Sequence, residues 1–226
     1  MAESIKVDLD TGASVTALIY RAASARTLGS TIILGHGAGA GQLSGFMVKF
    51  AAGLAERGLD AVTFNFSYTE QGRRVPDPGP RLEACYRSVI QAVTAQPALA
   101  SNHLIIGGKS MGGRIASQVA AQGLEARFNL AGLILLGYPL HPPGKPDQLR
   151  DKHLPKIKSR MLFVQGSRDT FGTPEELEKV FKVIGPNATL FVVEDGDHSF
   201  KVPKKHIPAQ EEIYSDVMDR IAGFAV

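Results

Sequence analysis

One serine, Ser110, stands in a pentapeptide whose spacing suits nucleophilic catalysis. It lies in Gly108-Lys-Ser-Met-Gly112, which follows a short apolar run, Leu104–Ile106, and precedes a helical pattern. A nucleophilic serine on a sharp strand-to-helix turn needs small residues two positions before and two after it. The same turn places the backbone N–H of Met111 at a helix N-terminus, where it can donate to an oxyanion. The pattern predicts an acyl-transfer nucleophile; the alternative is a structural glycine-rich turn, one that could hold a phosphate.

An aspartate and a histidine follow two later apolar runs, where they could activate this serine. Asp169 lies just past Met161–Val164, and His198 lies just past Thr189–Val193. A nucleophilic serine needs a base that takes its proton and a group that orients the base. Because ligands bind beyond the carboxyl ends of strands in an open α/β sheet, both loops can reach Ser110. We predict that Ser110, His198 and Asp169 form a catalytic triad.

The other histidines are weaker candidates for the base. His36 lies in a glycine-rich loop, where we expect it to be a structural hydrogen-bond partner. His141 stands beside two prolines and is expected either to contact substrate or to have a structural role. The rest lie at the wrong end of the sheet or among charged residues and are predicted to be surface residues: His103, His153 and His206.

Four other aspartates compete with Asp169 for the role of the acid. Asp195 and Asp197 are so near His198 in sequence that their carboxylates would struggle to reach the far ring nitrogen. The other two would serve only if the acid followed an earlier strand: Asp147 and Asp151. The position of Asp169, beyond the strand that precedes the His198 strand, favours Asp169.

A glycine-rich stretch, Gly35–Gly41, follows the apolar run Thr31–Leu34 and opens toward a helix. We expect the backbone N–H of Ala38 to join that of Met111 in an oxyanion hole. The alternative is a phosphate-binding loop. However, the stretch lacks both G-K-[ST] and the G-x-G-x-x-G spacing with an acidic residue about 20 positions on.

Apolar runs alternate with helical patterns along the whole chain, as the elements that position these residues must. The runs are continuous rather than alternating, which indicates strands buried on both faces of a parallel sheet. These predicted strands are Thr31–Leu34, Ala61–Phe66, Leu104–Ile106, Leu130–Leu136, Met161–Val164 and Thr189–Val193. The two leading segments, Ser4–Leu9 and Val15–Arg21, alternate better and predict an antiparallel edge hairpin.

Helical periodicity fills the gaps between the strands. Gly58 is expected to end the first helix, and Thr173-Pro-Glu-Glu176 predicts a capping box with a proline at the first helical position. The apolar rows of the predicted helices are Phe46–Leu54, Leu82–Val93, Leu177–Phe181 and Ile213–Ile221. Two long loops, 68–80 and 139–156, leave strand ends, and neither is long enough for a helical cap domain. The chain is therefore predicted to be one α/β domain, 1–226, with an open site.

Composition excludes several classes of protein. The 226 residues suit one domain with a substantial core, and the single cysteine, Cys85, permits no intramolecular disulfide and is expected in the core. The N-terminal segment resembles no signal peptide and no apolar run approaches a membrane span, so we expect a cytoplasmic protein with no membrane partner. The net charge is +3, and the basic stretches Lys152–Arg160 and Lys201–His206 are interpreted as solvated loops. We expect no nucleic-acid partner.

With these features together, the chain resembles the α/β-hydrolase superfamily over nearly its whole length. More narrowly, it is similar to the compact, lidless dienelactone-hydrolase-like group. Three strings are similar to a subgroup of bacteria and animals that includes a testis-expressed homologue and a chromatin-complex subunit. They are Gly72-Arg-Arg-Val-Pro-Asp77, Tyr138-Pro-Leu-His-Pro-Pro-Gly-Lys145 and Phe163-Val-Gln-Gly-Ser-Arg-Asp169. Dienelactone hydrolase itself uses a cysteine nucleophile where this chain has Ser110, so the resemblance does not extend to its substrate.

The sequence thus predicts a carboxylesterase-type serine hydrolase acting on small or short-acyl esters, without metal or cofactor. The candidate substrate contacts near strand ends, each of which could equally be core, are Phe46, Met47, Tyr68, Tyr138, Leu140, His141 and Phe171. Three loop cations would favour an acidic substrate if they were not simply solvated: Arg73, Arg74 and Lys145. The alternatives are a non-catalytic interaction module, an amide-cleaving hydrolase and a haloperoxidase-like side activity. The oligomeric state stays open.

Overall fold

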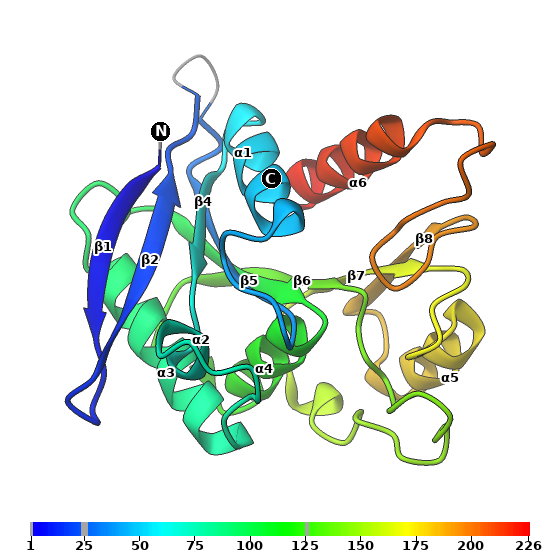
Figure 1. The fold of residues 1–226 in the computed structure, drawn as a ribbon, viewed down its shortest axis with the longest axis horizontal. Helices are drawn as coiled ribbons and strands as arrows, with labels where there is room; N and C mark the ends of the chain where they lie inside the picture. Colours follow the sequence, from blue (N-terminus) through cyan, green and yellow to red (C-terminus); the bar gives the residue numbers. More distant parts are fainter. Residues whose placement is uncertain (1, 24–26, 125–126) are drawn as a thin grey trace.

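Eight strands form one sheet in the computed structural model, which describes residues 2–23, 27–124 and 127–226 (Figure 1). Their order across the sheet is β1-β2-β4-β3-β5-β6-β7-β8. The strands are β1 (Glu3–Asp8), β2 (Ser14–Tyr20), β3 (Ser30–Gly35), β4 (Asp60–Phe64), β5 (His103–Lys109), β6 (Leu130–Leu136), β7 (Met161–Gly166) and β8 (Ala188–Val193).

The first two strands form the antiparallel hairpin that their alternating pattern predicts. In this hairpin Val7 lies opposite Val15, and β1 is an edge of the sheet. The second strand also runs antiparallel to β4, whereas the pairs from β4 through β8 are all parallel. The carboxyl ends of β3 and β5 to β8 therefore meet at one edge of the sheet, which confirms the predicted fold class.

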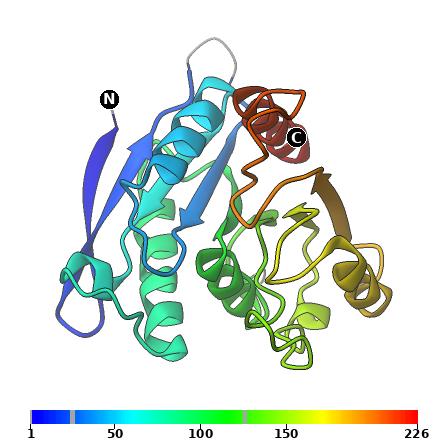
Figure 2. The ribbon, with the colours of Figure 1, turned by 45° about the vertical axis from the view of Figure 1, so that its right-hand side comes forward.

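Two helical layers cover the sheet. On one face lie α1 (Gly45–Glu56) and α6 (Gln210–Phe224), and on the other lie α3 (Gly79–Thr94), α4 (Met111–Ala120) and α5 (Pro174–Ile184) (Figures 1 and 2). Each layer buries its apolar row against the sheet, for example Phe50 and Leu54 on one face and Val89 and Ile90 on the other. Burial of about 25 cal/mol per Å² of apolar surface is the main force that holds such layers together.

Local signals locate several helix ends as expected. Thr173 and Glu176 form the predicted capping box at the start of α5, with the Thr173 side chain accepting from the Glu176 N–H. Gly58 has a φ of 92° just after α1, where glycine adopts the left-handed conformation that ends a helix without steric strain. Cys85 is buried on α3, and burial raises the pKa of its thiol to about 12. It is a core residue, as predicted.

Three boundaries and one burial pattern differ from the expectations. Strand β4 ends at Phe64 rather than at residue 66, because the chain turns there and the Phe66 N–H donates to His36 Nε2. The expected loop 68–80 begins in the short helix α2 (Ser67–Glu70) and ends where α3 starts. The loop 139–156 ends in a 3-10 turn, η2 (Leu154–Lys156). Strand β8 is only partly buried because it is the far edge of the sheet.

No cap domain covers the carboxyl edge of the sheet within the ranges that the structure describes (Figure 2). Among the same residues, no helix combines the length and apolarity needed to cross a bilayer. The lysines of the two basic stretches, such as Lys152 and Lys204, are exposed, as solvated loops should be.

Candidate active site

Ser110 occupies a strained turn between β5 and α4. Its φ is 51° and its ψ is −114°, an uncommon conformation for a residue with a side chain. The turn fits because Gly108 and Gly112, two positions before and after the serine, have no side chains: a Cβ on Gly108 would lie 2.2 Å from the carbonyl oxygen of Gly35. The Ser110 N–H donates to the carbonyl of Leu136 at the end of β6, which anchors the turn to the sheet. Strain of this kind persists only where the surroundings over-determine it, as they do here.

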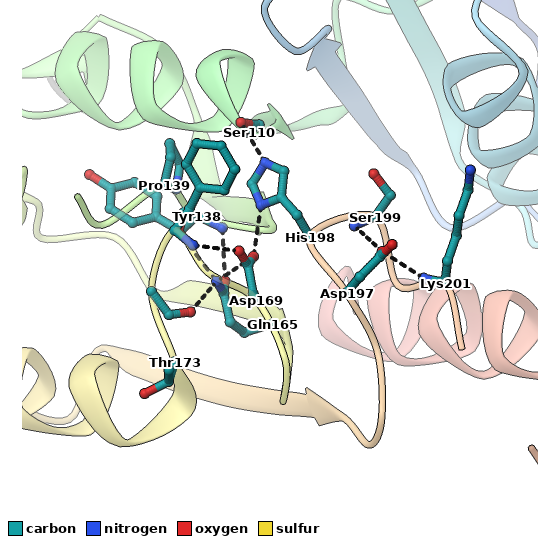
Figure 3. Close-up of polar contacts among 12 residues, drawn as sticks. Ser110, Tyr138, Pro139, Gln165, Asp169, Thr173, Asp197, His198, Ser199 and Lys201 are labelled. Carbon is teal, nitrogen blue, oxygen red and sulfur yellow. Dashed lines mark hydrogen bonds and ion pairs between the residues drawn. The ribbon is translucent and has the colours of Figure 1, made fainter. Parts of the chain in front are cut away.

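His198 links Ser110 to Asp169 through both of its ring nitrogens (Figure 3). His198 Nε2 lies 2.8 Å from Ser110 Oγ, and His198 Nδ1 lies 2.7 Å from Asp169 Oδ2. An ionised carboxylate only accepts hydrogen bonds, so the proton belongs on Nδ1. The lone pair on Nε2 then faces the serine hydroxyl. The structure therefore brings the three predicted triad residues into one hydrogen-bonded chain.

Asp169 is completely buried and held by groups besides His198. Its Oδ1 accepts from the Phe171 N–H at 2.9 Å, and its Oδ2 accepts from Gln165 Nε2 at 2.8 Å. Gln165, at the end of β7, also accepts from the Tyr138 N–H through its Oε1. These bonds fix the carboxylate in orientation (Figure 3). Sequence reasoning missed the role of Gln165, although an amide directly after the apolar run Met161–Val164 was a visible signal.

Neither of the aspartates next to His198 takes the place of Asp169. Asp197 Oδ1 accepts from the backbone N–H groups of Ser199 and Lys201 and so caps a local turn (Figure 3). Asp195 is exposed and pairs with His206 at 3.5 Å. The more distant candidates, Asp147 and Asp151, stay in the loop between β6 and β7.

The glycine-rich loop after β3 lies against the turn that carries Ser110. A Cβ on Gly37 would lie 3.7 Å from Ser110 Cβ, and Ala38 is the next residue along this loop. Met111 is the first residue of α4, and the first N–H groups of a helix have no acceptor within it. The loop and the helix thus bring the two predicted oxyanion donors, the Ala38 and Met111 N–H groups, to the same side of the sheet.

His36 supports this loop from within. It is fully buried, its Nδ1 lies 2.8 Å from the Gly37 carbonyl, and its Nε2 accepts from the Phe66 N–H at 3.2 Å. Burial lowers the pKa of the His36 ring, so the ring stays neutral with its proton on Nδ1. The predicted structural role of His36 is confirmed.

Of the remaining histidines, His103 is a surface residue as predicted, whereas His153 and His206 are partly buried. His103 is an exposed residue at the start of β5, as expected. His153 is not a surface residue: it is half-buried, and its Nε2 lies 2.8 Å from Ser117 Oγ on α4. His206 is half-buried beside Asp195. The surface prediction was wrong for both: His153 contacts Ser117 on α4, and His206 pairs with Asp195 within its own loop, 194–209.

The seven candidate substrate contacts fall into two groups. Met47, Tyr138 and Leu140 are at most 2% exposed and pack in the core, so they present no surface to a ligand. His141 is also buried and holds Glu176 at 3.2 Å, which is a structural pairing. Tyr68 is likewise only 1% exposed and packs in the core. The two candidates that stay partly exposed are Phe46 and Phe171, and Phe171 stacks on His198.

Phe171 is the candidate contact that lies against the proposed triad. The Phe171 ring stacks on the His198 ring, with centroids 4.3 Å apart. Beside the buried Tyr68 lies an open groove of about 530 Å³, formed by the loop from Gly39 to Ser44 and the segment that contains Arg73 and Arg74. Arg73 is paired with Asp77 at 2.7 Å, which leaves Arg74 as the exposed cation without a described partner on this groove.

Lys109 is the charged residue at the site that sequence reasoning overlooked. It directly precedes Ser110, and its side chain is only 7% exposed. Its ammonium has no hydrogen-bond partner among the described residues. Burial lowers the pKa of this ammonium to about 8, although the charges of Asp169 and Asp197 oppose the shift. The described residues contain no cluster of histidines, cysteines and carboxylates suited to hold a metal ion.

The chain matches known proteins both in its sequence family and in its fold. Residues 29–226 match a family described as an alpha/beta hydrolase domain. The chain belongs to this family. Its resemblance to the dienelactone-hydrolase-like group is also borne out by solved structures of similar fold.

Three of these structures illustrate the likeness. A serine hydrolase without a lid from Xanthomonas campestris is 17% identical, with a TM-score of 0.74 over 99% of this chain and 95% of the other. A dienelactone hydrolase from Anabaena variabilis is 16% identical, with a TM-score of 0.76 over 99% and 96%. An esterase from Pyrococcus furiosus is 14% identical, with a TM-score of 0.75 over 99% and 90%. At these identities the likeness shows the shared fold.

Proposed function

We propose that this chain is a serine hydrolase that cleaves small or short-acyl carboxylic esters through an acyl-enzyme. The observation that carries the proposal is the hydrogen-bonded chain from Ser110 through His198 to Asp169. An isolated serine hydroxyl is a weak nucleophile, and this arrangement supplies the base that activates it. The resemblance in fold to serine hydrolases and to an esterase supports the same class of reaction.

The proposed reaction has two steps. Ser110 Oγ attacks the ester carbonyl while its proton moves to His198 Nε2, and the alcohol leaves with that proton. Water then attacks the acyl-enzyme, again with His198 as the base, and releases the acid. Asp169 holds the ring and stabilises the imidazolium that forms in each step.

The Ala38 and Met111 N–H groups are the proposed oxyanion donors. Each such donor in a partly dry site contributes on the order of 3 kcal/mol to the transition state. The fold limits how dry the site can be, because no cap domain covers the described part of the carboxyl edge. Small or short-acyl esters fit such a site better than long acyl chains, which need an extended apolar wall to bind.

The groove beside the glycine-rich loop offers room for one end of the ester. It begins at Gly39, next to the proposed donor Ala38, and runs past Tyr68 to Arg74. Phe171 stacks on the His198 ring. We propose that the groove and the face of Phe171 receive the two halves of the substrate.

Fluorophosphonate labelling, read by intact mass with the adduct mapped by peptide, tests the proposal. A single adduct on Ser110, together with turnover of acetyl or butyryl esters, is the expected result. Folded protein that takes up no label, or an adduct on another residue, would overturn the proposed mechanism. Labelling of Ser110 without turnover in an ester panel graded by acyl length would overturn the substrate class alone.

A further inference from the structure

A buried ammonium without a hydrogen-bond partner lies beside the proposed triad. Lys109 ends β5, directly before Ser110, and its Nζ is enclosed by protein. An isolated buried charge is costly unless its surroundings compensate for it. The stem of Lys109 packs against the glycine-rich loop, since a Cβ on Gly37 would lie 3.8 Å from Lys109 Cγ. The first part of the Lys109 side chain therefore lies against the loop that carries Ala38.

Gly137 shows where the ammonium lies relative to His198. A Cβ on Gly137 would be 2.9 Å from Lys109 Nζ and 3.4 Å from His198 Nδ1. Both nitrogens thus border a single point at the end of β6. Gly137 has a φ of 60°, so the position favours glycine for its backbone as well as for the space. On the other side, Lys109 Nζ lies 6.0 Å from the ring centroid of Phe46 on α1.

The ammonium faces carboxylates that do not contact it. The charges of Asp169, after β7, and of Asp197, after β8, both favour its protonated form. Two other titratable side chains lie near this cluster: His36 in the loop after β3, and Tyr214 on α6, whose hydroxyl is influenced by Asp197. Burial keeps His36 neutral and raises the pKa of Tyr214. Lys49 Nζ lies 5.7 Å from the Tyr214 ring centroid, farther along α1. Among the described residues, Lys109 is the cation whose ammonium borders the same point as His198, and its field falls on Asp169 and His198.

We propose that Lys109 is a positioning residue that acts through space on the triad, keeping His198 neutral and Asp169 ionised in the resting enzyme. A nearby cation disfavours a second positive charge on the imidazole and favours a negative charge on the carboxylate. With this cation in place, protonation of the ring is less favourable than it would be without Lys109. This inference rests on the proposed function, because it concerns the same triad.

The test compares Lys109→Met, which removes the charge, with Lys109→Arg, which retains it. NMR of protein with ¹³C-labelled histidine rings follows the titration of His198, assigned with His198→Gln. Removing a unit charge at this range is expected to move the His198 midpoint upward by about one pH unit. In Lys109→Met, kcat/KM on a short-acyl ester is expected to be about tenfold lower than in the parent protein at pH values below the parent's His198 midpoint. Above the variant's own midpoint, kcat/KM should equal the parent value. Lys109→Arg is expected to restore the parent midpoint.

The parent protein supplies a second measurement if a variant fails to fold. As the ammonium loses its proton near pH 8, the His198 ring signals should show a further shift at that pH. A folded Lys109→Met protein with the parent's His198 midpoint, or a parent without this second shift, would overturn the inference. The NMR readout needs no turnover, so it separates failure of this inference from failure of the proposed esterase activity.

Discussion

Gly112 and Gly35 approach so closely that a Cβ on Gly112 would lie 2.0 Å from the Gly35 carbonyl oxygen. This contact joins the first turn of α4 to the end of β3. It therefore sets the spacing between the residue that follows the serine, Met111, and the loop that carries Ala38. The second glycine of the pentapeptide is needed for this contact as well as for the turn itself.

Gly112→Ala should therefore destabilise the fold. The added methyl group meets backbone rather than a flexible side chain, and overpacking of this kind costs about 2 kcal/mol or more. Urea unfolding followed by circular dichroism measures the change. Gly45→Ala is the matched control, because a Cβ there meets nothing within 4 Å and α1 begins at this residue. That control should change stability by less than about 1 kcal/mol, in the stabilising direction. Equal losses in the two variants would contradict the packing argument.

Ser110→Ala should abolish ester turnover and leave the fold intact. Loss of a triad serine costs far more than about a hundredfold in kcat, because no other group forms the acyl-enzyme. The measurement is kcat on a short-acyl ester, with circular dichroism as the check on folding. Residual activity above about one hundredth of the parent value would point to another nucleophile.

Asp169→Asn should lower kcat by about ten-thousand-fold, because an amide permits the wrong tautomer of His198. The control is Asp195→Asn, since Asp195 is exposed and its φ of 56° is one that asparagine tolerates. Steady-state kinetics of the two variants under the same conditions decide between the acids. A larger loss for Asp195→Asn than for Asp169→Asn would mean that the wrong carboxylate has been assigned.

His153 should make the fold less stable in mild acid. Burial, and then the charge of Arg114, lower the pKa of its ring from 6.5 to about 4. Between these two pH values the unfolded chain binds the proton more readily than the folded chain, so the free energy of unfolding falls as the pH decreases. The contribution is fully present above pH 6.5 and lost by about pH 4.

Urea unfolding of the parent and of His153→Gln at pH 7, 6, 5 and 4 checks this expectation. Glutamine has no charge to acquire, so the difference in stability between the two proteins should change steadily in favour of the variant as the pH falls. Circular dichroism at pH 7 establishes that the variant is folded. Parallel stability curves over the whole range would show that His153 titrates normally.

Local pattern was enough to predict much of the fold. The capping box at Thr173 and Glu176 forms as expected, since a cap depends on residues three positions apart. The hairpin of β1 and β2 follows from alternation within each strand. Continuous apolar runs identified the buried strands, and failed to predict the exposure of β8, because an edge is defined by the missing neighbour rather than by the strand itself.

The proposed triad could be predicted from the sequence for a similar reason. Ser110, Asp169 and His198 each follow a strand, and parallel strands bring their carboxyl ends to one edge of the sheet. Their types and order were therefore sufficient to predict that they would meet. What the sequence did not reveal is which aromatic or aliphatic side chains face that edge: Met47 and Tyr138 are core residues, whereas Phe171 stacks on the base.

The sequence by itself determined the nucleophilic turn, the order of acid and base, and the layered α/β arrangement, because each depends on spacing within a short segment or on strand order. Only the tertiary structure decided the burial of Lys109, the amide of Gln165 on Asp169 and the placement of His153 against Ser117. These relationships join side chains from segments distant in sequence. The burial and the charge of these side chains depend on the packing of the whole domain, which a local sequence pattern does not predict.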